Sequence, residues 1–204
     1  MIAFVLSEHA HGLTPDRSAR YEEVRARLAS VLGDEIESVS YEEVESPRAD
    51  ALVLSGSTDP WALHDRRSLG RFYEELRRFP GPILGICAGM QMLVRSQGGV
   101  VAAAAKPVRG FGRIDVVDDT DLLAGLEPRF EVFRSHEDEV TELPAGFRVL
   151  ASSQTCAVEV VAAEDRPWWG TQFHPEEWTE EHPAGREIIA RFGELAGISA
   201  SVLH

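Results

Sequence analysis

Hydrophobic and polar positions in the first half of the chain alternate between two patterns. Short apolar runs have the length of buried strands. Between them lie segments with apolar residues three or four positions apart, which is typical of helices with one buried face. Strands that alternate with helices in this way pair in parallel and form a layered α/β fold. The expected strands are Ile2–Leu6, Ile36–Tyr41, Ala51–Leu54 and Ile83–Ile86, and the expected helices are Arg17–Leu32, Arg66–Phe79 and Gly89–Gln97.

The second half of the chain has a different pattern. Short strand-like runs follow one another there, separated by turn-forming residues. A last amphipathic segment, Gly185–Leu195, is expected to be helical. No repeat or linker interrupts the sequence, so residues 1–204 are expected to form one domain, a three-layer α/β/α fold with an open, mostly parallel sheet flanked by helices. The expected strands of this half are Arg113–Val117, Phe130–Phe133, Arg148–Ser152, Ala157–Ala162 and Trp168–Phe173.

Composition and charge narrow the classes of function. With 20 basic and 34 acidic side chains the net charge is -14, which disfavours binding to nucleic acid or to an anionic membrane. No apolar run reaches the roughly 18 residues of a membrane span, and the first residues lack the basic flank of a signal peptide. The two cysteines, Cys87 and Cys156, are too few for a disulfide framework. We therefore expect a cytoplasmic protein.

The segment Gly85-Ile86-Cys87-Ala88-Gly89 has the pattern glycine-x-nucleophile-x-glycine, which forms a sharp turn between a strand and a helix. Such a turn brings the residues two before and two after the nucleophile so close that neither has room for a Cβ. The N–H groups that begin the following helix favour a thiolate and can hold an oxyanion. The alternative is a buried structural cysteine that has glycine neighbours by chance.

A cysteine nucleophile needs a base, and the stretch WWGTQFHPEEW supplies a candidate. His174 follows a strand-like run, Pro175 fixes the turn, and Glu176 lies two residues further on. The carboxylate can hold one nitrogen of the imidazole while the other nitrogen faces the thiol. The alternative is a surface histidine beside the acidic start of a helix.

Together these stretches resemble the class I, triad-type glutamine amidotransferases over nearly the whole chain. GICAGMQML is similar to the cysteine elbow of that family, TQFHPE to its histidine–glutamate motif, and LSGSTDPW to the loop that carries its oxyanion glycine. The run SHEDEVTELPAGFRVLASSQ looks most similar to the glutaminase portion of guanosine monophosphate synthetases, or to a stand-alone relative. The resemblance implies an active site at the carboxyl ends of the parallel strands.

The resemblance also implies a role for each matching residue. Cys87 would attack the side-chain amide carbon of glutamine, His174 would transfer the proton, and Glu176 would orient His174. The backbone N–H groups of Ser57 and Ala88 would hold the tetrahedral oxyanion. No cofactor is implied, and no metal is expected, because the histidines lack a specific ligand spacing. The implied substrate-binding residues are Gly56, Gln91, Ser135 and His136.

Two further expectations come from the same comparison. Ser57 stands where many members of the family have a second glycine, so its backbone must be unstrained or its loop rearranged. Lys106, Arg109 and Arg113 are expected in a loop opposite the nucleophile, where they could meet a partner or an anionic substrate.

Three functions remain open from the sequence. The first is a glutaminase that supplies ammonia to a separate synthetase, because these 204 residues contain no glycine-rich phosphate loop that could activate an acceptor with ATP. The second is a stand-alone hydrolase or peptidase of γ-glutamyl compounds, which Ser57 in the oxyanion loop suggests. The third is a non-catalytic module on this fold, which the intact set of Cys87, His174 and Glu176 disfavours.

Overall fold

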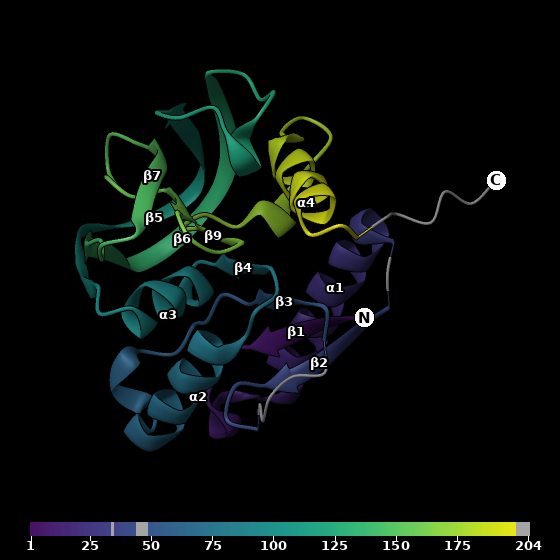
Figure 1. The fold of residues 1–204 in the computed structure, drawn as a ribbon, viewed down its shortest axis with the longest axis vertical. Helices are drawn as coiled ribbons and strands as arrows, with labels where there is room; N and C mark the ends of the chain where they lie inside the picture. The colour runs from purple at the N-terminus through teal and green to yellow at the C-terminus, as the bar shows by residue number, and fades with distance from the viewer. Residues whose placement is uncertain (34, 44–48, 199–204) are drawn as a thin grey trace.

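The computed structural model describes residues 1–33, 35–43 and 49–198, and these residues are arranged around one sheet of nine strands (Figure 1). The strand order across the sheet is β2-β1-β3-β4-β9-β8-β7-β5-β6. The strands are β1 (Ile2–Leu6), β2 (Ile36–Ser40), β3 (Ala51–Leu54), β4 (Ile83–Ile86), β5 (Val100–Val116), β6 (Arg129–Glu142), β7 (Phe147–Ser152), β8 (Val160–Ala163) and β9 (Trp168–Thr171).

Four α-helices cover the two faces of the parallel part of the sheet (Figure 1). Helices α1 (Pro15–Leu32) and α4 (Ala184–Leu195) pack together on one face, and α2 (Arg66–Arg78) and α3 (Ala88–Ser96) pack together on the other. The helix ends match their sequence signals. Thr14 caps α1 before Pro15, and Gly33, with φ 67°, ends it in the left-handed conformation. No described helix is long and apolar enough to cross a membrane.

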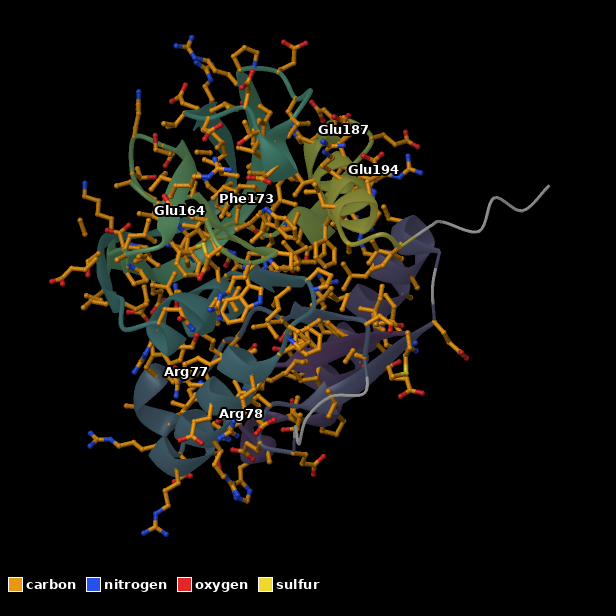
Figure 2. The ribbon with its side chains drawn as sticks, in the orientation of Figure 1. Arg77, Arg78, Glu164, Phe173, Glu187 and Glu194 are labelled. Carbon is orange, nitrogen blue, oxygen red and sulfur yellow. The ribbon has the colours of Figure 1, made fainter. Side chains whose placement is uncertain are left out.

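The buried strands alternate their side chains between two cores. In β1, Ile2 and Phe4 face α1 and α4, whereas Ala3 and Val5 face α2 and α3. Each strand of this region is apolar throughout because both of its faces are covered, which is why it forms a continuous hydrophobic run in the sequence. Figure 2 shows Phe173 inside the molecule, while Arg78 and Glu187 extend from its outer surface.

The sheet has a parallel half and an antiparallel half. Strands β2, β1, β3, β4 and β9 pair in parallel, and β9 then begins an antiparallel series through β8, β7, β5 and β6. The predicted α/β/α class is confirmed, but parallel pairing is confined to β1–β4, which come from the half with alternating strands and helices, and to β9 from the second half. Because the carboxyl ends of β1, β3, β4 and β9 lie at one edge, the loops that follow them meet there.

The prediction of short strands in the second half was wrong for two of them. Strands β5 and β6 have 17 and 14 residues and form one long antiparallel ribbon. Lys106, Arg109 and Arg113 therefore lie on β5 and not in a loop. Most of β5 is exposed or half-buried, so it lacks the apolar alternation that would have marked it as a strand.

Candidate active site

Cys87 occupies the sharp turn that its glycine neighbours predict. It lies between β4 and α3 with φ 51° and ψ -109°, a backbone conformation that is costly for a residue with a side chain. A Cβ on Gly85 would come 2.6 Å from the backbone nitrogen of Met90, and a Cβ on Gly89 would come 2.5 Å from the carbonyl oxygen of Leu54. Both glycines are therefore required by close backbone contacts around the strained cysteine.

His174 and Glu176 come next to Cys87 because β9 pairs in parallel with β4. The histidine follows β9 and begins the short 3-10 helix Pro175–Glu177. Its Nδ1 atom is 2.8 Å from Oε1 of Glu176, whose side chain is buried. Gly56, in the loop after β3, lies against the imidazole, and a Cβ there would be 2.8 Å from Cε1 of His174.

The carbonyl oxygen of Ser135 connects the cysteine and the histidine. It is 3.8 Å from Sγ of Cys87 and 3.3 Å from Nε2 of His174. Both ring nitrogens of His174 thus face an oxygen, and only the doubly protonated imidazolium donates at both. Burial lowers the pKa of His174, but the charges of Glu176 and Cys87 and hydrogen bonds with both raise that pKa well above its ordinary value. This arrangement favours the imidazolium form of His174.

The two residues expected to supply oxyanion N–H groups line the same pocket as Cys87. Ala88 begins α3, so its amide is one of those that a helix leaves free at its N-terminus. Ser57 follows β3, and its φ is not positive, since among described non-glycine residues only Cys87 and Asp121 have positive φ. The serine therefore fits the loop without backbone strain. Ser57, Cys87 and Ala88 line one pocket of about 560 Å³.

Gln91 lies at the same pocket, but its amide group is already engaged within the protein. Its Nε2 donates to the carbonyl oxygen of Asp138 at 2.9 Å and to Oε1 of Gln172 at 3.0 Å. Its Oε1 accepts from Nε1 of Trp61 at 3.2 Å. The side chain therefore connects Trp61, β6 and the segment after β9, and a substrate would have to displace one of these bonds to reach its amide.

Gln172 is a site residue that the sequence did not reveal. The side chain is fully buried, and its Nε2 donates to Sγ of Cys87 at 3.6 Å. A donor at this position stabilises a thiolate more than a thiol. The side chain reaches the sulfur because β9 ends at Thr171, two residues earlier than predicted. The only available signal was its place in TQFHPE, directly between the strand and His174.

Arg27 also escaped detection, because it lies on α1, far from the motifs in sequence. Its Nε donates to the carbonyl oxygen of Glu176 and its NH2 group to that of Trp178, both at 2.6 Å. Its guanidinium stacks 4.0 Å from the centre of the Trp178 ring. The arginine thus fixes the backbone that presents Glu176 to His174.

Ser135 and His136 lie on β6, and the structure uses them differently. Ser135 presents its backbone carbonyl to the site, whereas one ring nitrogen of His136 lies within 4.8 Å of the Cys156 sulfur and a Glu159 oxygen. All three of these side chains are buried, so they are the candidate metal ligands of the described part of the chain. Arg134, however, lies 3.7 Å from Glu159 and already supplies a positive charge.

Two side chains of this cluster have raised pKa values. Burial raises the pKa of the Cys156 thiol and also that of the Glu159 carboxyl group. Both groups are therefore shifted towards their protonated forms, and a metal ion would have to displace both protons. His136 lines the pocket at Cys87, but neither of its ring nitrogens has a hydrogen-bond partner among the described residues.

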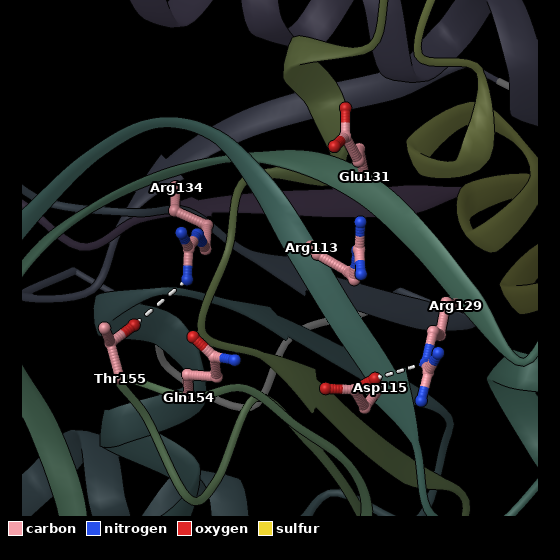
Figure 3. Close-up of a pocket in the computed structure, with 7 residues that line it drawn as sticks. All are labelled: Arg113, Asp115, Arg129, Glu131, Arg134, Gln154 and Thr155. Carbon is pink, nitrogen blue, oxygen red and sulfur yellow. Dashed lines mark hydrogen bonds and ion pairs between the residues drawn. The ribbon is translucent and has the colours of Figure 1, made fainter.

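Cavities lie on both sides of the cysteine–histidine pair. The pocket of about 560 Å³ contains Cys87, and a second pocket of about 380 Å³ contains His174 and Glu176. Both are lined by Ser57, Thr58, Arg109 and Ser135. Arg109 is thus brought to the site, as expected, although from a strand. A third pocket of about 430 Å³ on the β5–β6 ribbon shares no lining residue with these two (Figure 3).

Comparison with known proteins identifies the family. The family model described as glutamine amidotransferase class-I matches residues 16–194. The chain belongs to the class-I glutamine amidotransferases. The expectation of a cysteine-dependent, glutamine-hydrolysing enzyme is therefore confirmed.

Several similar proteins carry the name GMP synthase. The chain is 35% identical over 181 residues to one subunit of the glutamine-hydrolyzing GMP synthase of Thermococcus kodakarensis, covering 89% of this chain and 90% of that one. It is 34% identical to the longer GMP synthase of Ectopseudomonas mendocina, of which the match covers 38%, with 94% of this chain. A crystal structure of a Thermoplasma acidophilum protein described as one GMP synthase subunit has a TM-score of 0.81 at 28% identity, covering 97% of this chain and 94% of that one.

Proposed function

We propose that this chain is the glutaminase subunit of a two-subunit GMP synthase, with Cys87, His174 and Glu176 as its catalytic triad. The observation that carries the assignment of the triad is the meeting of these three side chains at the carboxyl edge of the sheet, with Nδ1 of His174 2.8 Å from Oε1 of Glu176. The observation that carries the choice of pathway is the similarity to the T. kodakarensis GMP synthase subunit over 89% of the chain.

The first half of the reaction forms an acyl-enzyme. The Cys87 thiolate attacks the side-chain amide carbon of glutamine, and the oxyanion that develops accepts hydrogen bonds from the Ser57 and Ala88 amides. The imidazolium of His174 then donates its Nε2 proton to the nitrogen of the leaving group. The C–N bond breaks, ammonia leaves, and a γ-glutamyl thioester remains on Cys87. Glu176 stabilises the positive charge of His174 before this transfer.

The second half returns the enzyme to its starting state. Neutral His174 takes a proton from water, and the resulting hydroxide attacks the thioester carbonyl carbon. The same two amides hold the second oxyanion, the C–S bond breaks, and glutamate leaves. Cys87 is again a thiolate beside an imidazolium. The balance is glutamine and water in, glutamate and ammonia out.

The ammonia acceptor is proposed to be a separate synthetase subunit that forms GMP. The relatives of T. kodakarensis and Pyrococcus furiosus are each named as one subunit of a GMP synthase, which supports a division of that reaction between two polypeptides here. We propose that the pair works in the cytoplasm, where both cysteines stay reduced. A stand-alone γ-glutamyl hydrolase would use the same triad, and the experiments below separate the two.

The first experiment measures intact mass after the chain is incubated with 6-diazo-5-oxo-L-norleucine, a glutamine-shaped alkylating agent. We expect one adduct on the wild type, none on Cys87→Ala, and protection by glutamine. Cys156→Ala is the matched control and should label like the wild type, because Cys156 is buried away from the pocket at Cys87. Labelling that persists in Cys87→Ala would refute the assignment of the nucleophile.

The second experiment tests the partner. Glutamine-dependent and ammonia-dependent GMP formation are compared in mixtures of the chain with a GMP synthetase subunit. The proposal predicts that Cys87→Ala abolishes the glutamine-dependent reaction and leaves the ammonia-dependent one unchanged. Faster turnover of γ-glutamyl peptides or amines than of glutamine, without any effect of the synthetase, would identify a γ-glutamyl hydrolase instead.

A further inference from the structure

Glu8 is a buried carboxylate beside the oxyanion loop, which is defined here as residues Gly56–Asp59. It lies two residues after β1 and is 1% exposed. Because β1 and β3 are parallel neighbours, the residues that follow them lie side by side at the carboxyl edge of the sheet. A buried carboxylate is expensive unless hydrogen bonds satisfy it, so its partners indicate its purpose.

Three of the donors to Glu8 come from the oxyanion loop itself. Its Oε1 accepts from the backbone N–H and the hydroxyl of Thr58, each at 2.9 Å, and its Oε2 accepts from the hydroxyl of Ser57 at 2.8 Å. The hydroxyl of Tyr21 also lies 3.0 Å from Oε1 and 3.0 Å from the carbonyl oxygen of Gly56. One carboxylate therefore binds two successive residues of the loop.

These bonds decide which loop amides remain free. The Thr58 amide donates to Glu8, and the Asp59 amide donates to the hydroxyl of Ser57 at 3.0 Å. The Ser57 hydroxyl thus accepts one bond and donates its own proton to Glu8. The backbone N–H of Ser57 donates to no described residue. Of the three consecutive amides from Ser57 to Asp59, the one proposed to bind the oxyanion is the one left without an internal partner.

The positively charged side chain of Arg17 also holds the oxyanion loop. NH1 of Arg17 is 2.7 Å from Oδ1 of Asp59, 3.0 Å from the carbonyl oxygen of Gly12 and 3.6 Å from Oε2 of Glu8. The arginine offsets two carboxylates that would otherwise repel each other at the end of the loop. The loop is thus held at Ser57 and Thr58 by Glu8 and at Asp59 by Arg17.

We propose that Glu8 is a positioning residue for glutamine hydrolysis, which acts by fixing the oxyanion loop so that the Ser57 amide is presented to the tetrahedral intermediate. The proposal rests on the function proposed above. Preorganised donors stabilise a transition state because they need no rearrangement when the charge develops.

The direct test is Glu8→Gln, which keeps the size of the side chain but replaces one acceptor oxygen by an NH2 donor. Where that NH2 group replaces Oε2, it faces the Ser57 hydroxyl, which in the wild type donates its hydrogen bond to this oxygen. We expect kcat for glutamine hydrolysis, measured on the chain mixed with a GMP synthetase subunit, to fall about 10²-fold, the scale seen when one oxyanion donor is lost, with a much smaller change in KM. Glu23→Gln, at an exposed position on α1, is the matched control and should behave like the wild type.

A second readout separates positioning from a merely structural role. Iodoacetamide alkylates a thiolate by displacement at a saturated carbon, a reaction that forms no oxyanion. The rate of Cys87 alkylation should therefore stay within about twofold of wild type in Glu8→Gln, while hydrolysis falls about 10²-fold. Equal losses of alkylation and hydrolysis, or hydrolysis at the wild-type rate, would overturn the proposal.

Ser57→Ala removes the other partner of the hydrogen bond between Ser57 and Glu8. It removes the hydroxyl that Glu8 holds but keeps the backbone amide. Because the two variants break one connection, their effects on kcat should be less than additive in the double variant. Additive effects would contradict the connection. A wild-type chain that neither hydrolyses glutamine nor labels with the glutamine analogue, even when mixed with a GMP synthetase subunit, would instead refute the proposed function, and the two failures are thus distinguishable.

Discussion

Gly56 and His174 touch across the active site: a Cβ built on Gly56 would lie 2.8 Å from Cε1 of the imidazole. The contact places the oxyanion loop directly against the proposed general base. A side chain at position 56 would occupy the space of the imidazole, whose Nδ1 atom is held at 2.8 Å from Oε1 of Glu176. The site therefore needs a carboxylate on one side of the histidine and a glycine on the other.

Gly56→Ala should displace the imidazole or the loop and lower kcat about 10²-fold, since a shift of about 1 Å at a reacting group has that effect. Glutaminase assays of the purified variant measure it. Gly70→Ala on α2 is the matched control, because nothing lies within 4 Å of a Cβ there. The control should keep full activity and gain about 0.5–1 kcal/mol of unfolding free energy. Wild-type kcat in Gly56→Ala would show that the contact is not tight.

Gln172→Glu should reduce the fraction of Cys87 present as thiolate. The change replaces the Nε2 donor that lies 3.6 Å from Sγ by a carboxylate oxygen, which repels the thiolate or must itself be protonated. Alkylation by iodoacetamide at pH 6 should be slowed about tenfold or more, the effect of about 1.4 kcal/mol. Gln154→Glu, at an exposed position in the pocket on the β5–β6 ribbon, is the control. Unchanged alkylation of Gln172→Glu would remove Gln172 from the site chemistry.

Glu176→Gln should change how stability depends on pH. In the wild type the pKa of His174 is raised well above its ordinary value by Glu176 and Cys87, against the opposing effect of burial. A raised pKa stabilises the folded state fully below the unfolded value of about 6.5, and this contribution is lost as pH rises through the folded value. The wild-type advantage in unfolding free energy over Glu176→Gln should thus be largest near pH 6 and shrink towards pH 9.

Denaturant unfolding at several pH values measures this difference. Glu181→Gln, at an exposed position in the same segment, serves as the control and should follow the wild-type pH profile. An advantage over Glu176→Gln that grows with pH would mean that His174 is neutral in the folded chain.

Arg27→Lys should loosen the segment that carries Glu176. A lysine cannot bond both carbonyl oxygens that Arg27 holds or stack in the same way on Trp178. Leaving such carbonyl groups unpaired costs about 1–3 kcal/mol, and kcat should fall because Glu176 is less well placed. Thermal unfolding and glutaminase assays test this, with the exposed Arg78→Lys as control. Loss of stability without loss of kcat would limit Arg27 to a structural role.

The sequence predicted the parallel half of the fold well and the β5–β6 ribbon poorly. Strands β1, β3 and β4 have the predicted bounds, because a strand covered on both faces forms a continuous apolar run. Strand β5 is largely exposed and carries Gly110, Gly112 and Pro107, so no local pattern marks it as a strand. Its pairing with β6 is what makes it one.

The residues of the site also fall into those that the sequence revealed and those that it did not. Cys87 was recognisable because its two glycines are a local requirement of one tight turn. Gln172 and Arg27 were not, because they contact residues 85 and 149 or more positions away. Gln91 was expected to bind substrate, and it lines the pocket at Cys87. Its bonds to Trp61, Asp138 and Gln172 join segments distant in sequence, so they exist only in the folded chain.

The sequence by itself determined the family, the strand–turn–helix that presents Cys87, and the residue types of the proposed triad, because each depends on a few neighbouring residues with strict backbone or chemical demands. Only the tertiary structure decided that His174 faces both Glu176 and the Ser135 carbonyl, and that Glu8 grips the oxyanion loop. Those relationships join segments that are distant in sequence. They exist only when strand pairing brings the carboxyl ends of β1, β3, β4 and β9 to one edge and folds the β5–β6 ribbon over it.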